Sequence, residues 1–273
     1  MFIVFDIGGT KTKWGLSKNL KEIDNFCQID TFPCYKDFLD FLKRNNFFNL
    51  KIACFGFPGV FDKSKNKLIY CPNLKDYEFR NLKKDLEKIL KCKIILENDA
   101  NLAGIGEANF GEGKNYKIIS YITFSTGIGG TKIVDRKIDE NFFGFEPGHS
   151  LFLILYKKDI LPFQVEELIG GSSLFKIFNK ELDKVKDIYF WKDFSKIASL
   201  FLVNVSLYWS PEIIIIGGGL SKRINMKILE KNFNKFYPFN LKPQLRRSKL
   251  LDKVGIYGGL SLIKEHLINK RTF

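Results

Sequence analysis

The chain has 273 residues, of which 45% are hydrophobic and 27% are charged, a balance that supplies a core and excludes a largely disordered chain. At roughly 150 residues per domain, the length predicts two modest domains or one large one. No apolar run reaches the roughly 18 residues that a membrane-spanning helix needs, and the opening sequence lacks the pattern of a signal peptide. We therefore expect a cytoplasmic protein that binds no membrane.

The formal net charge of +14 comes mainly from lysines that are scattered along the sequence. The sequence has no dense basic run, which favours a solvated basic surface; binding of a phosphate-rich ligand is the second interpretation. The five cysteines are odd in number and none forms a CxxC pair. This predicts neither a disulfide framework nor a zinc site.

The first part of the chain predicts strands that alternate with amphipathic helices. The expected strands cover residues 2–6, 13–17, 25–31, 51–55 and 93–96, and the expected helices cover residues 35–44, 79–90 and 99–109. A polar stretch with two glycines follows at residues 111–115 and is the best candidate for a domain boundary.

A second series of elements begins at residue 118 and repeats the opening layout of strand, glycine turn and strand. Its expected strands cover residues 118–124, 131–134 and 212–216, and its expected helices cover residues 163–179, 190–209 and 257–267. The alternation predicts an α/β fold with substantial parallel sheet. We expect a first domain over residues 1–112, a second over residues 113–256, and a closing segment, 257–273, that packs back on the first.

The glycine turn after the first strand has the composition of a phosphate-binding turn. Glycines that follow a buried strand leave backbone N–H groups free to face an anion, and adjacent hydroxyl, ammonium and carboxylate groups can bind phosphate or a metal-bound water. The candidate residues are Asp6, Gly8, Gly9, Thr10 and Lys11. The turn matches neither the P-loop nor the dinucleotide fingerprint. A plain hairpin turn is the alternative interpretation.

Two further glycine turns follow apolar strands later in the chain. The second contains Thr126, Gly127, Gly129 and Gly130, and the third is Gly217–Gly219, where Ser221 is a candidate N-cap for the next helix. For the third turn, a strand-to-helix turn that needs positive φ is the alternative interpretation. Three such turns spread over the whole chain favour a nucleotide held between two domains.

The polar group at residues 97–101 ends a strand and opens a helix. Asp99 in this group can accept a proton from an attacking hydroxyl as a general base, while capping of the helix is its structural alternative. Asn98 and the Pro58-Gly59 turn are suited to line a site for a polyol. Glu146 and His149 form a further polar cluster, and Glu166 lies at the start of a helical stretch, where an exposed carboxylate is the simpler interpretation.

These motifs resemble the ROK family (repressor, open reading frame, kinase) within the actin-like sugar kinases. The matching segments follow the family's order over nearly the whole length: DIGGTKTKWG from residue 6, GFPGV at 56–60, ENDANLAGIGE at 97–107, TFSTGIGGTKIV at 123–134, EPGH at 146–149, PEIIIIGGGLS at 211–221 and VGIYGGLSL at 254–262. The resemblance implies two actin-like (ribonuclease H-like) α/β domains with a cleft between them.

The resemblance also implies an ATP-dependent sugar kinase whose acceptor is glucose or a close relative. ATP and Mg²⁺ are expected on the first two glycine turns, with the nucleoside against Gly217–Gly219. Asp6 would bind the metal either directly or through a water molecule. Asp99 would be the catalytic base. The expected sugar ligands are Pro58, Gly59, Asn98, Glu146, His149 and Glu166. Many relatives are homodimers, so a homodimer is a further expectation.

The sequence departs from the family after His149. Many members carry a CxCGxxGCxE zinc motif there, whereas residues 150–166 contain no cysteine, so we expect no zinc. This stretch is also short, as in polyphosphate glucokinases, which keeps polyphosphate as an alternative donor. The range of sugars that the family phosphorylates keeps an N-acetylhexosamine as an alternative acceptor. A sugar-binding regulator is the alternative from another class. We disfavour DNA binding because the first strand is expected at residue 2, leaving no helix-turn-helix segment before it.

Overall fold

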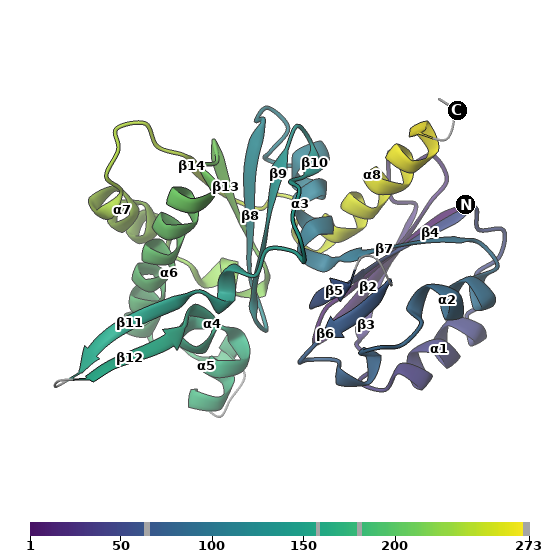
Figure 1. The fold of residues 1–273 in the computed structure, drawn as a ribbon, viewed down its shortest axis with the longest axis horizontal. Helices are drawn as coiled ribbons and strands as arrows, with labels where there is room; N and C mark the ends of the chain where they lie inside the picture. Colours follow the sequence, from purple (N-terminus) through teal and green to yellow (C-terminus); the bar gives the residue numbers. More distant parts are fainter. Residues whose placement is uncertain (63–65, 157–158, 179–181, 270–273) are drawn as a thin grey trace.

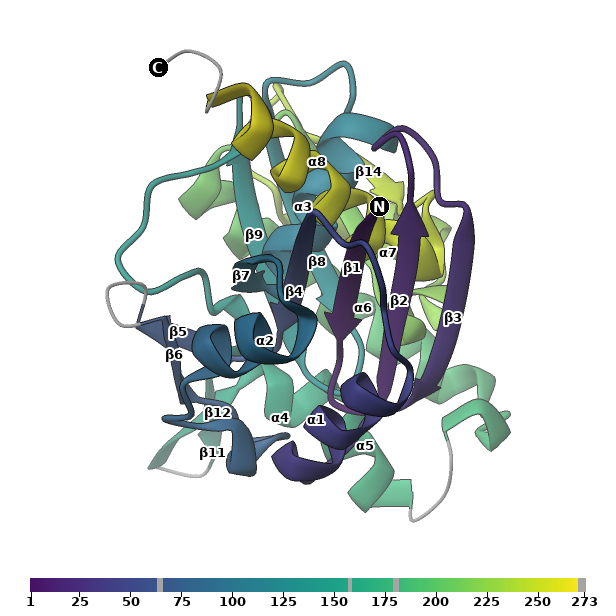
Figure 2. The ribbon, with the colours of Figure 1, turned by 90° about the vertical axis from the view of Figure 1, so that its right-hand side faces the viewer.

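The computed structural model describes residues 1–62, 66–156, 159–178 and 182–269. Two five-stranded sheets dominate the fold and lie on either side of a central helix pair (Figure 1). The first sheet has the order β3-β2-β1-β4-β7, which Figure 2 shows face on. Its strands are β1 (Phe2–Ile7), β2 (Lys11–Ser17), β3 (Asn25–Asp30), β4 (Ile52–Phe57) and β7 (Lys93–Asn98).

The second sheet has the order β10-β9-β8-β13-β14. Its strands are β8 (Ile118–Phe124), β9 (Ile128–Val134), β10 (Lys137–Ile138), β13 (Ile213–Gly217) and β14 (Gln244–Arg247). In the first sheet the central strand β1 pairs antiparallel with β2 and parallel with β4. In the second sheet the central strand β8 pairs in the same way, antiparallel with β9 and parallel with β13. The repeated opening seen in the sequence therefore corresponds to a repeated sheet plan, and the chain has the expected mixed α/β architecture.

Alternation along β1 divides the core of the first half into two layers. Ile3 and Phe5 face α1 (Tyr35–Arg44) and α2 (Leu82–Leu90), and the Phe5 ring stacks on Phe55 at 4.8 Å between centroids. Val4, on the other face, packs against α8 (Val254–Asn269). Because successive strand residues point to opposite faces, an apolar strand such as FIVFDI requires helices on both sides of its sheet.

The helices α3 (Asp99–Phe110) and α8 form the layer between the two sheets (Figure 1). α3 is buried around its circumference, which fits its sequence DANLAGIGEANF, because small and apolar residues occupy every face. Close packing with α8 depends on small residues: a Cβ at Gly258 would lie 1.7 Å from the carbonyl oxygen of Leu102. α3 thus connects the core of the first sheet with that of the second, and its N-terminus opens between them.

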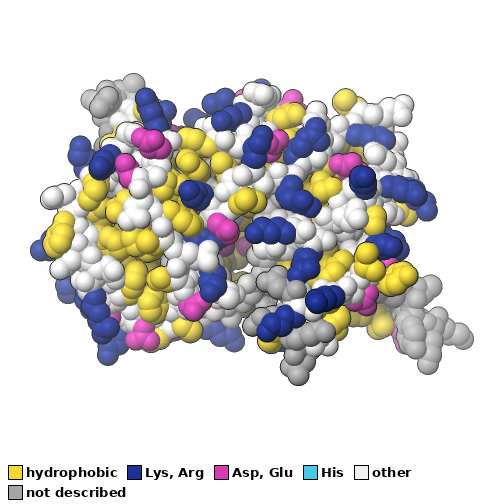
Figure 3. Space-filling model, turned by 180° about the vertical axis from the view of Figure 1, so that it is seen from behind, with side chains coloured by type: hydrophobic (Ala, Val, Ile, Leu, Met, Phe, Trp, Pro, Cys, Tyr) yellow, Lys and Arg dark blue, Asp and Glu magenta, His cyan; other side chains and the backbone are white. Residues whose placement is uncertain are grey.

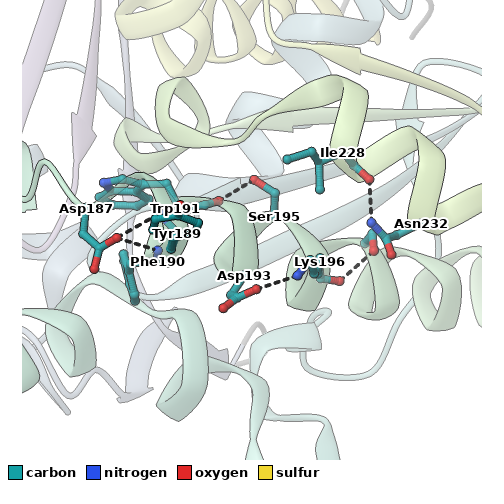
Figure 4. Close-up of polar contacts among 10 residues, drawn as sticks. Asp187, Tyr189, Phe190, Trp191, Asp193, Ser195, Lys196, Ile228 and Asn232 are labelled. Carbon is teal, nitrogen blue, oxygen red and sulfur yellow. Dashed lines mark hydrogen bonds and ion pairs between the residues drawn. The ribbon is translucent and has the colours of Figure 1, made fainter.

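The second sheet is covered on its far face by α6 (Ile188–Trp209) and α7 (Met226–Phe236). Asp187 caps α6 by accepting from the N–H groups of Tyr189 and Phe190, as the close-up in Figure 4 shows. Asn225, and not the expected Ser221, caps α7 by accepting from the N–H of Ile228. Ser221 is buried in the 3₁₀ helix η4 (Gly219–Arg223), which precedes α7.

Several boundaries differ from the sequence prediction. α2 begins at Leu82 and not at 79, because Phe79 has φ of 59°, which no right-handed helix contains. The segment predicted as helix over 163–179 is instead the end of a strand followed by α4 (Val165–Ile169) and α5 (Gly171–Phe178), and residue 179 lies outside the described residues. α8 begins at Val254, before the expected 257, and residues 270–273 are likewise outside the described part.

Two hairpins lie apart from the main sheets. β5 (Val60–Asp62) pairs with β6 (Lys67–Tyr70), and β11 (Leu151–Tyr156) pairs with β12 (Asp159–Gln164). The second hairpin extends from the lower edge of the second half in Figure 1. It occupies the stretch that follows the 3₁₀ turn η2 (Pro147–His149) and leads directly into α4.

Lysine and arginine side chains are spread over the whole face drawn in Figure 3, in both halves of the molecule, without one dominant cluster. This distribution agrees with the scattered lysines of the sequence. Across the described residues, no helix combines the length and the apolar content that crossing a bilayer requires.

Candidate active site

Asp99 is the first residue of α3 and lies where the two halves meet. Asn98, not Asp99, is the N-cap: its Oδ1 accepts from the N–H groups of Ala100 at 2.8 Å and Asn101 at 3.1 Å. The Asp99 carboxylate accepts a further bond from the Ala100 N–H. Burial, together with the nearby charge of Asp6, raises the pKa of Asp99 to about 7. A carboxyl group with such a pKa can accept a proton near neutral pH.

Asp6 ends β1 beside the first turn of α8. Its carboxylate lies so close to Gly255 that a Cβ there would be 2.5 Å from it. Burial raises the pKa of Asp6 to about 6, an effect that the positive charge of Lys13 opposes. Lys13 is itself paired with Asp252 at 2.9 Å. No described residue forms a salt bridge with Asp6, and a desolvated carboxylate of this kind fits Mg²⁺, which proteins bind through one or two carboxylates together with substrate phosphates.

The first glycine turn, Gly8-Gly9-Thr10, joins β1 to β2. The N–H of Gly8 donates to the carbonyl oxygen of Lys11 at 2.9 Å, and the carbonyl oxygen of Gly8 accepts from the Thr31 hydroxyl at 2.8 Å. Lys11, proposed from the sequence as a phosphate ligand, directs its ammonium to Asp30 at 2.5 Å. The turn is therefore held rigidly, while Lys11 is engaged by the neighbouring strand.

The second glycine turn, between β8 and β9, meets the first across the gap between the halves. The hydroxyls of Thr10 and Thr126 are hydrogen-bonded at 3.1 Å. Gly129 lies against Ala100, the residue after Asp99, with 3.5 Å between an ideal Cβ and the alanine methyl. The second turn therefore reaches the N-terminus of α3 through Gly129, and the first turn contacts the second through Thr10, so both turns lie near Asp99.

Glu166 lies against this second turn and is not an exposed helix carboxylate. Its Oε2 accepts from the N–H of Ile128 at 2.7 Å, and a Cβ at Gly127 would lie 2.3 Å from the same oxygen. Glu166 belongs to α4, the short helix after the β11–β12 hairpin. The carboxylate thus ties that helix to the turn between β8 and β9.

The third glycine turn, Gly217–Gly219, ends β13 next to the end of β8. Gly218 has φ of +85°, and a Cβ there would lie 2.3 Å from the carbonyl oxygen of Phe124, so only glycine fits without strain. At Gly219, in contrast, a Cβ would meet no atom within 4 Å. The turn therefore presents backbone to open space on the side of the second sheet where its strands end.

A pocket between the two halves lies beside Asp99. Gly59, with φ of +102°, contributes to it, and its carbonyl oxygen accepts from the Asn98 side chain at 3.0 Å. The pocket is lined by Gly59, Phe61, Glu97, Asn98, Asn101, Phe143, Gly144, Phe145 and Glu146. The carbonyl oxygen of Pro58 faces inward to the Cys71 thiol, which donates to it at 3.0 Å. A larger cavity of about 770 Å³ lies elsewhere, between α1 and α2, and contains none of the site residues.

Glu146 and His149 approach this pocket from the second half. Burial raises the pKa of Glu146. The His149 Nδ1 is 2.7 Å from the Oε1 of Gln164, its Nε2 is 4.0 Å from the Oε2 of Glu146, and its ring centroid is 6.2 Å from that of Tyr70. His149 is thus in contact with residues from both halves.

Residues far apart in the sequence converge here, and most of those proposed from the sequence are among them. Three contacts were missed by sequence reasoning: Gln164 and Tyr70 against His149, and Asn73, whose side chain covers Gly9. The sequence carried one signal for Asn73, since it follows Pro72 in a polar turn, but nothing placed that turn on the first glycine turn.

No group of three or more His, Cys, Asp or Glu side chains that could hold a metal ion occurs in the part of the chain that the structure describes. The expected absence of zinc stays a prediction. The stretch without cysteine forms the β11–β12 hairpin, and His149 there has an amide partner, Gln164.

Comparison with known proteins agrees with this geometry. A model of the ROK family matches residues 2–153, more than half of the chain. An uncharacterized protein of Clostridium perfringens is 26% identical over 97% of this chain and 98% of its own length. The N-acetyl-D-glucosamine kinase of Salmonella paratyphi B is 23% identical over 96% of this chain and 99% of its own.

A solved structure has the same fold. The ROK family glucokinase from Streptomyces griseus, in complex with glucose and AMPPNP, superposes with a TM-score of 0.79 at 22% identity, covering 96% of this chain and 98% of the glucokinase. At this coverage the match extends over both halves of the molecule.

Proposed function

Because the chain belongs to the ROK family, we propose that it is a sugar kinase that transfers the γ-phosphoryl group of ATP to a hydroxyl of glucose or a closely related hexose. The observation that carries this proposal is Asp99: a buried carboxyl with a pKa of about 7, at a helix N-terminus and near two glycine turns. The glucokinase complex with glucose and AMPPNP supports the choice of substrates.

In the proposed reaction Asp99 accepts the proton of the attacking hydroxyl. The cap at Asn98 and the packing of α3 hold the backbone that carries this carboxylate, which also accepts from the Ala100 N–H. Phosphoryl transfer demands mainly positioning and stabilisation of charge. A base held at a rigid helix end meets the first demand, and the surrounding backbone N–H groups meet the second.

The donor is proposed to lie on the three glycine turns. The first and second turns face each other through Thr10 and Thr126 and would bind the phosphates, while the third leaves open space at Gly219 for the nucleoside. Asp6 would hold Mg²⁺, which supplies neutralisation of the phosphate charge when bound. Lys11, engaged with Asp30, would have to exchange partners to contact a phosphate.

The acceptor is proposed to bind at the pocket between the halves, whose volume of about 10 Å³ would have to increase to admit a hexose. Asn98, Gly59 and Pro58 would contact it from the first half, and Glu146, His149 and Glu166 from the second. We propose that the halves are separate domains, residues 1–112 and 113–256 with the closing helix on the first, which approach each other when both substrates bind. Such closure excludes water and limits idle hydrolysis of ATP.

The test is release of ADP by the purified protein with Mg²⁺, ATP and a panel of hexoses and N-acetylhexosamines. We expect formation of ADP that depends on one or a few sugars, with glucose among them. Strict dependence on N-acetylglucosamine would favour the activity of the Salmonella relative instead. Turnover only when polyphosphate replaces ATP would change the donor but leave the assignment of Asp99 intact.

A panel without any turnover, combined with measurable sugar binding, would favour a sugar-sensing regulator. Loss of all sugar binding as well would contradict the assignment of the pocket. Titration calorimetry with the same sugars, run beside the activity panel, separates these two outcomes.

A further inference from the structure

We propose that Gln164 is a positioning residue that fixes the tautomer of His149, so that an unprotonated Nε2 faces the acceptor pocket. The inference rests on the proposed function, because it assigns that pocket to the sugar, but the state of the imidazole can be measured without turnover. It gives the β11–β12 hairpin a role in recognition of the acceptor.

The hydrogen bond determines which ring nitrogen carries the proton. The Nδ1 of His149 is 2.7 Å from the Oε1 of Gln164, and an amide oxygen can only accept. Nδ1 therefore donates, and in the neutral ring Nε2 is left with a free lone pair. That lone pair is directed to the side of the ring on which Glu146 lies.

Gln164 is itself held by the backbone around it. It ends β12, pairs with Leu151 of β11, and its N–H donates to the Oε2 of Glu167 at 2.8 Å. The next residue, Val165, donates its N–H to the carbonyl oxygen of Ser150, the neighbour of His149. The hairpin therefore brings residues 149 and 164 together at its base, and a side chain of the right length at 164 reaches the imidazole.

Nε2 and Glu146 together form a pair of acceptors. Their separation of 4.0 Å is too long for a hydrogen bond, so each remains available to a ligand. A neutral Nε2 and a carboxylate can each accept from one hydroxyl, which is the pattern that a vicinal diol of a sugar satisfies. A doubly protonated imidazole would instead attract Glu146 and compete with the diol.

The charged and titratable groups around the ring are few among the described residues. Glu146 faces Nε2, Glu166 on α4 acts on Glu146, and Tyr70 on β6 lies at the ring edge. Gln164 is the neutral member of this set. A carboxylate in its place would hold a second proton on His149, whereas the amide accepts from Nδ1 without favouring the charged ring.

The direct test is long-range ¹H–¹⁵N NMR of the imidazole nitrogens. The chain has two histidines, and the variant His266→Asn assigns the signals of His149. We expect neutral His149 to be protonated at Nδ1 in the sugar-free protein. A predominant Nε2–H tautomer would overturn the proposal, whatever the activity measurements show.

Two variants extend the test to recognition. In Gln164→Glu we expect the NMR titration midpoint of His149 to rise by about one pH unit, because a carboxylate favours the charged ring. The KM for the sugar at neutral pH should rise about tenfold, the loss of one hydrogen bond in a buried site, with kcat within about threefold. Gln164→Met, with a similar shape and no acceptor, should raise KM without moving the midpoint upward.

Ser150→Ala is the matched control. Its hydroxyl donates to the carbonyl oxygen of Pro147 at 2.7 Å, so the change perturbs the same loop without touching the imidazole. We expect the wild-type tautomer and midpoint, and a KM close to that of the wild type. Equal effects of Ser150→Ala and Gln164→Met on the KM would mean that Gln164 acts only on the loop. If no sugar is turned over, the tautomer and the midpoint still decide the proposal, while the proposed function fails separately.

Discussion

The two sheets have the same strand order but carry different chemistry at equivalent positions. Asp6 lies opposite Gly56 where β1 meets β4, and at the matching place Thr123 lies opposite Gly217 where β8 meets β13. The first half thus carries carboxylates near its strand ends, with Asp6 next to the end of β1 and Asp99 directly after β7, whereas the second half carries hydroxyls and glycines there. The same strand arrangement occurs in both halves. In the proposed function, a few residues near the strand ends give the first half the base and give the second half the glycine turn for the nucleoside.

The difference has an energetic consequence. Carboxylates that are buried near one another have raised pKa values and resist ionisation, as at Asp6 and Asp99. The third glycine turn has no such penalty, but at Gly218 it depends on a backbone conformation that only glycine adopts without strain. The first half should therefore be sensitive to charge and the second to side-chain volume.

The largest expected effect comes from Asp99→Asn. Removal of the proposed base should lower kcat by about a thousandfold or more, within or above the usual range for general bases. The near-identical shape should preserve the fold and the affinity for sugar. Steady-state kinetics measure kcat, and titration calorimetry measures the affinity for the sugar. Activity within tenfold of the wild type would remove Asp99 from the role of base.

The second prediction concerns stability and pH. The folded pKa values of Asp6 and Asp99, about 6 and about 7, lie above the ordinary value of 3.8. The folded state therefore binds more protons than the unfolded state between about pH 4 and 7, and stability falls as the pH rises through this window. We expect the melting temperature without ligands to fall between pH 5 and pH 8.

The variants Asp6→Asn and Asp99→Asn should each reduce that slope and raise the melting temperature at pH 8 by a few degrees. Glu22→Gln, at an exposed turn of the same half, is the control and should change neither. A pH slope that both aspartate variants leave unchanged would show that neither carboxyl is destabilised by burial.

The third prediction tests the second half. Gly218→Ala forces a side chain into positive φ and against the carbonyl oxygen of Phe124, which should cost about 1–3 kcal/mol of stability. The displaced turn should also weaken binding of ATP, while binding of sugar is retained. The matched control is Gly219→Ala, where a Cβ meets no atom within 4 Å and the melting temperature should stay close to that of the wild type. Equal destabilisation by the two changes would contradict this account of the turn.

The smallest expected effect lies at the hydrogen bond between Thr10 and Thr126. A double-mutant cycle with Thr10→Ser, Thr10→Ala and Thr126→Ala should show a coupling of about 0.5–1 kcal/mol in kcat/KM for ATP, the usual worth of one hydrogen bond. Thr10→Ser keeps the hydroxyl and should therefore retain most of this coupling energy. Strict additivity of the two alanine changes would mean that the bond does not connect the halves during catalysis.

Much of this architecture could be predicted from the sequence. Short apolar strands followed by glycines, such as those before Gly8 and Gly217, indicated the strand ends where the turns lie, because strand periodicity and glycine are local signals. Asp99 could be singled out because it follows a strand and opens a helix. The resemblance supplied the roles, which geometry alone did not distinguish from capping.

The features that could not be predicted from the sequence depend on tertiary contacts, which local sequence patterns do not encode. The β11–β12 hairpin was missed because its apolar run has no clear period, and its end was mistaken for helix over residues 163–179. The partners of His149 and Gly9 come from segments that only the tertiary fold brings near, Gln164 in one case and Asn73 in the other. Capping by Asp99 was the alternative to its role as a base, and in the structure Asn98 is the N-cap, while both side chains accept from the Ala100 N–H.

The division of labour between the halves is tested most directly by binding of AMPPNP, with Mg²⁺, to Asp99→Asn and to Gly218→Ala, measured by calorimetry beside turnover of both. We predict that Asp99→Asn binds the nucleotide within about threefold of the wild type although its turnover is lost, because its charge serves proton transfer. Gly218→Ala should bind it at least about tenfold more weakly, since the turn that holds the donor is displaced. Loss of nucleotide binding in Asp99→Asn, or normal binding in Gly218→Ala, would contradict the account.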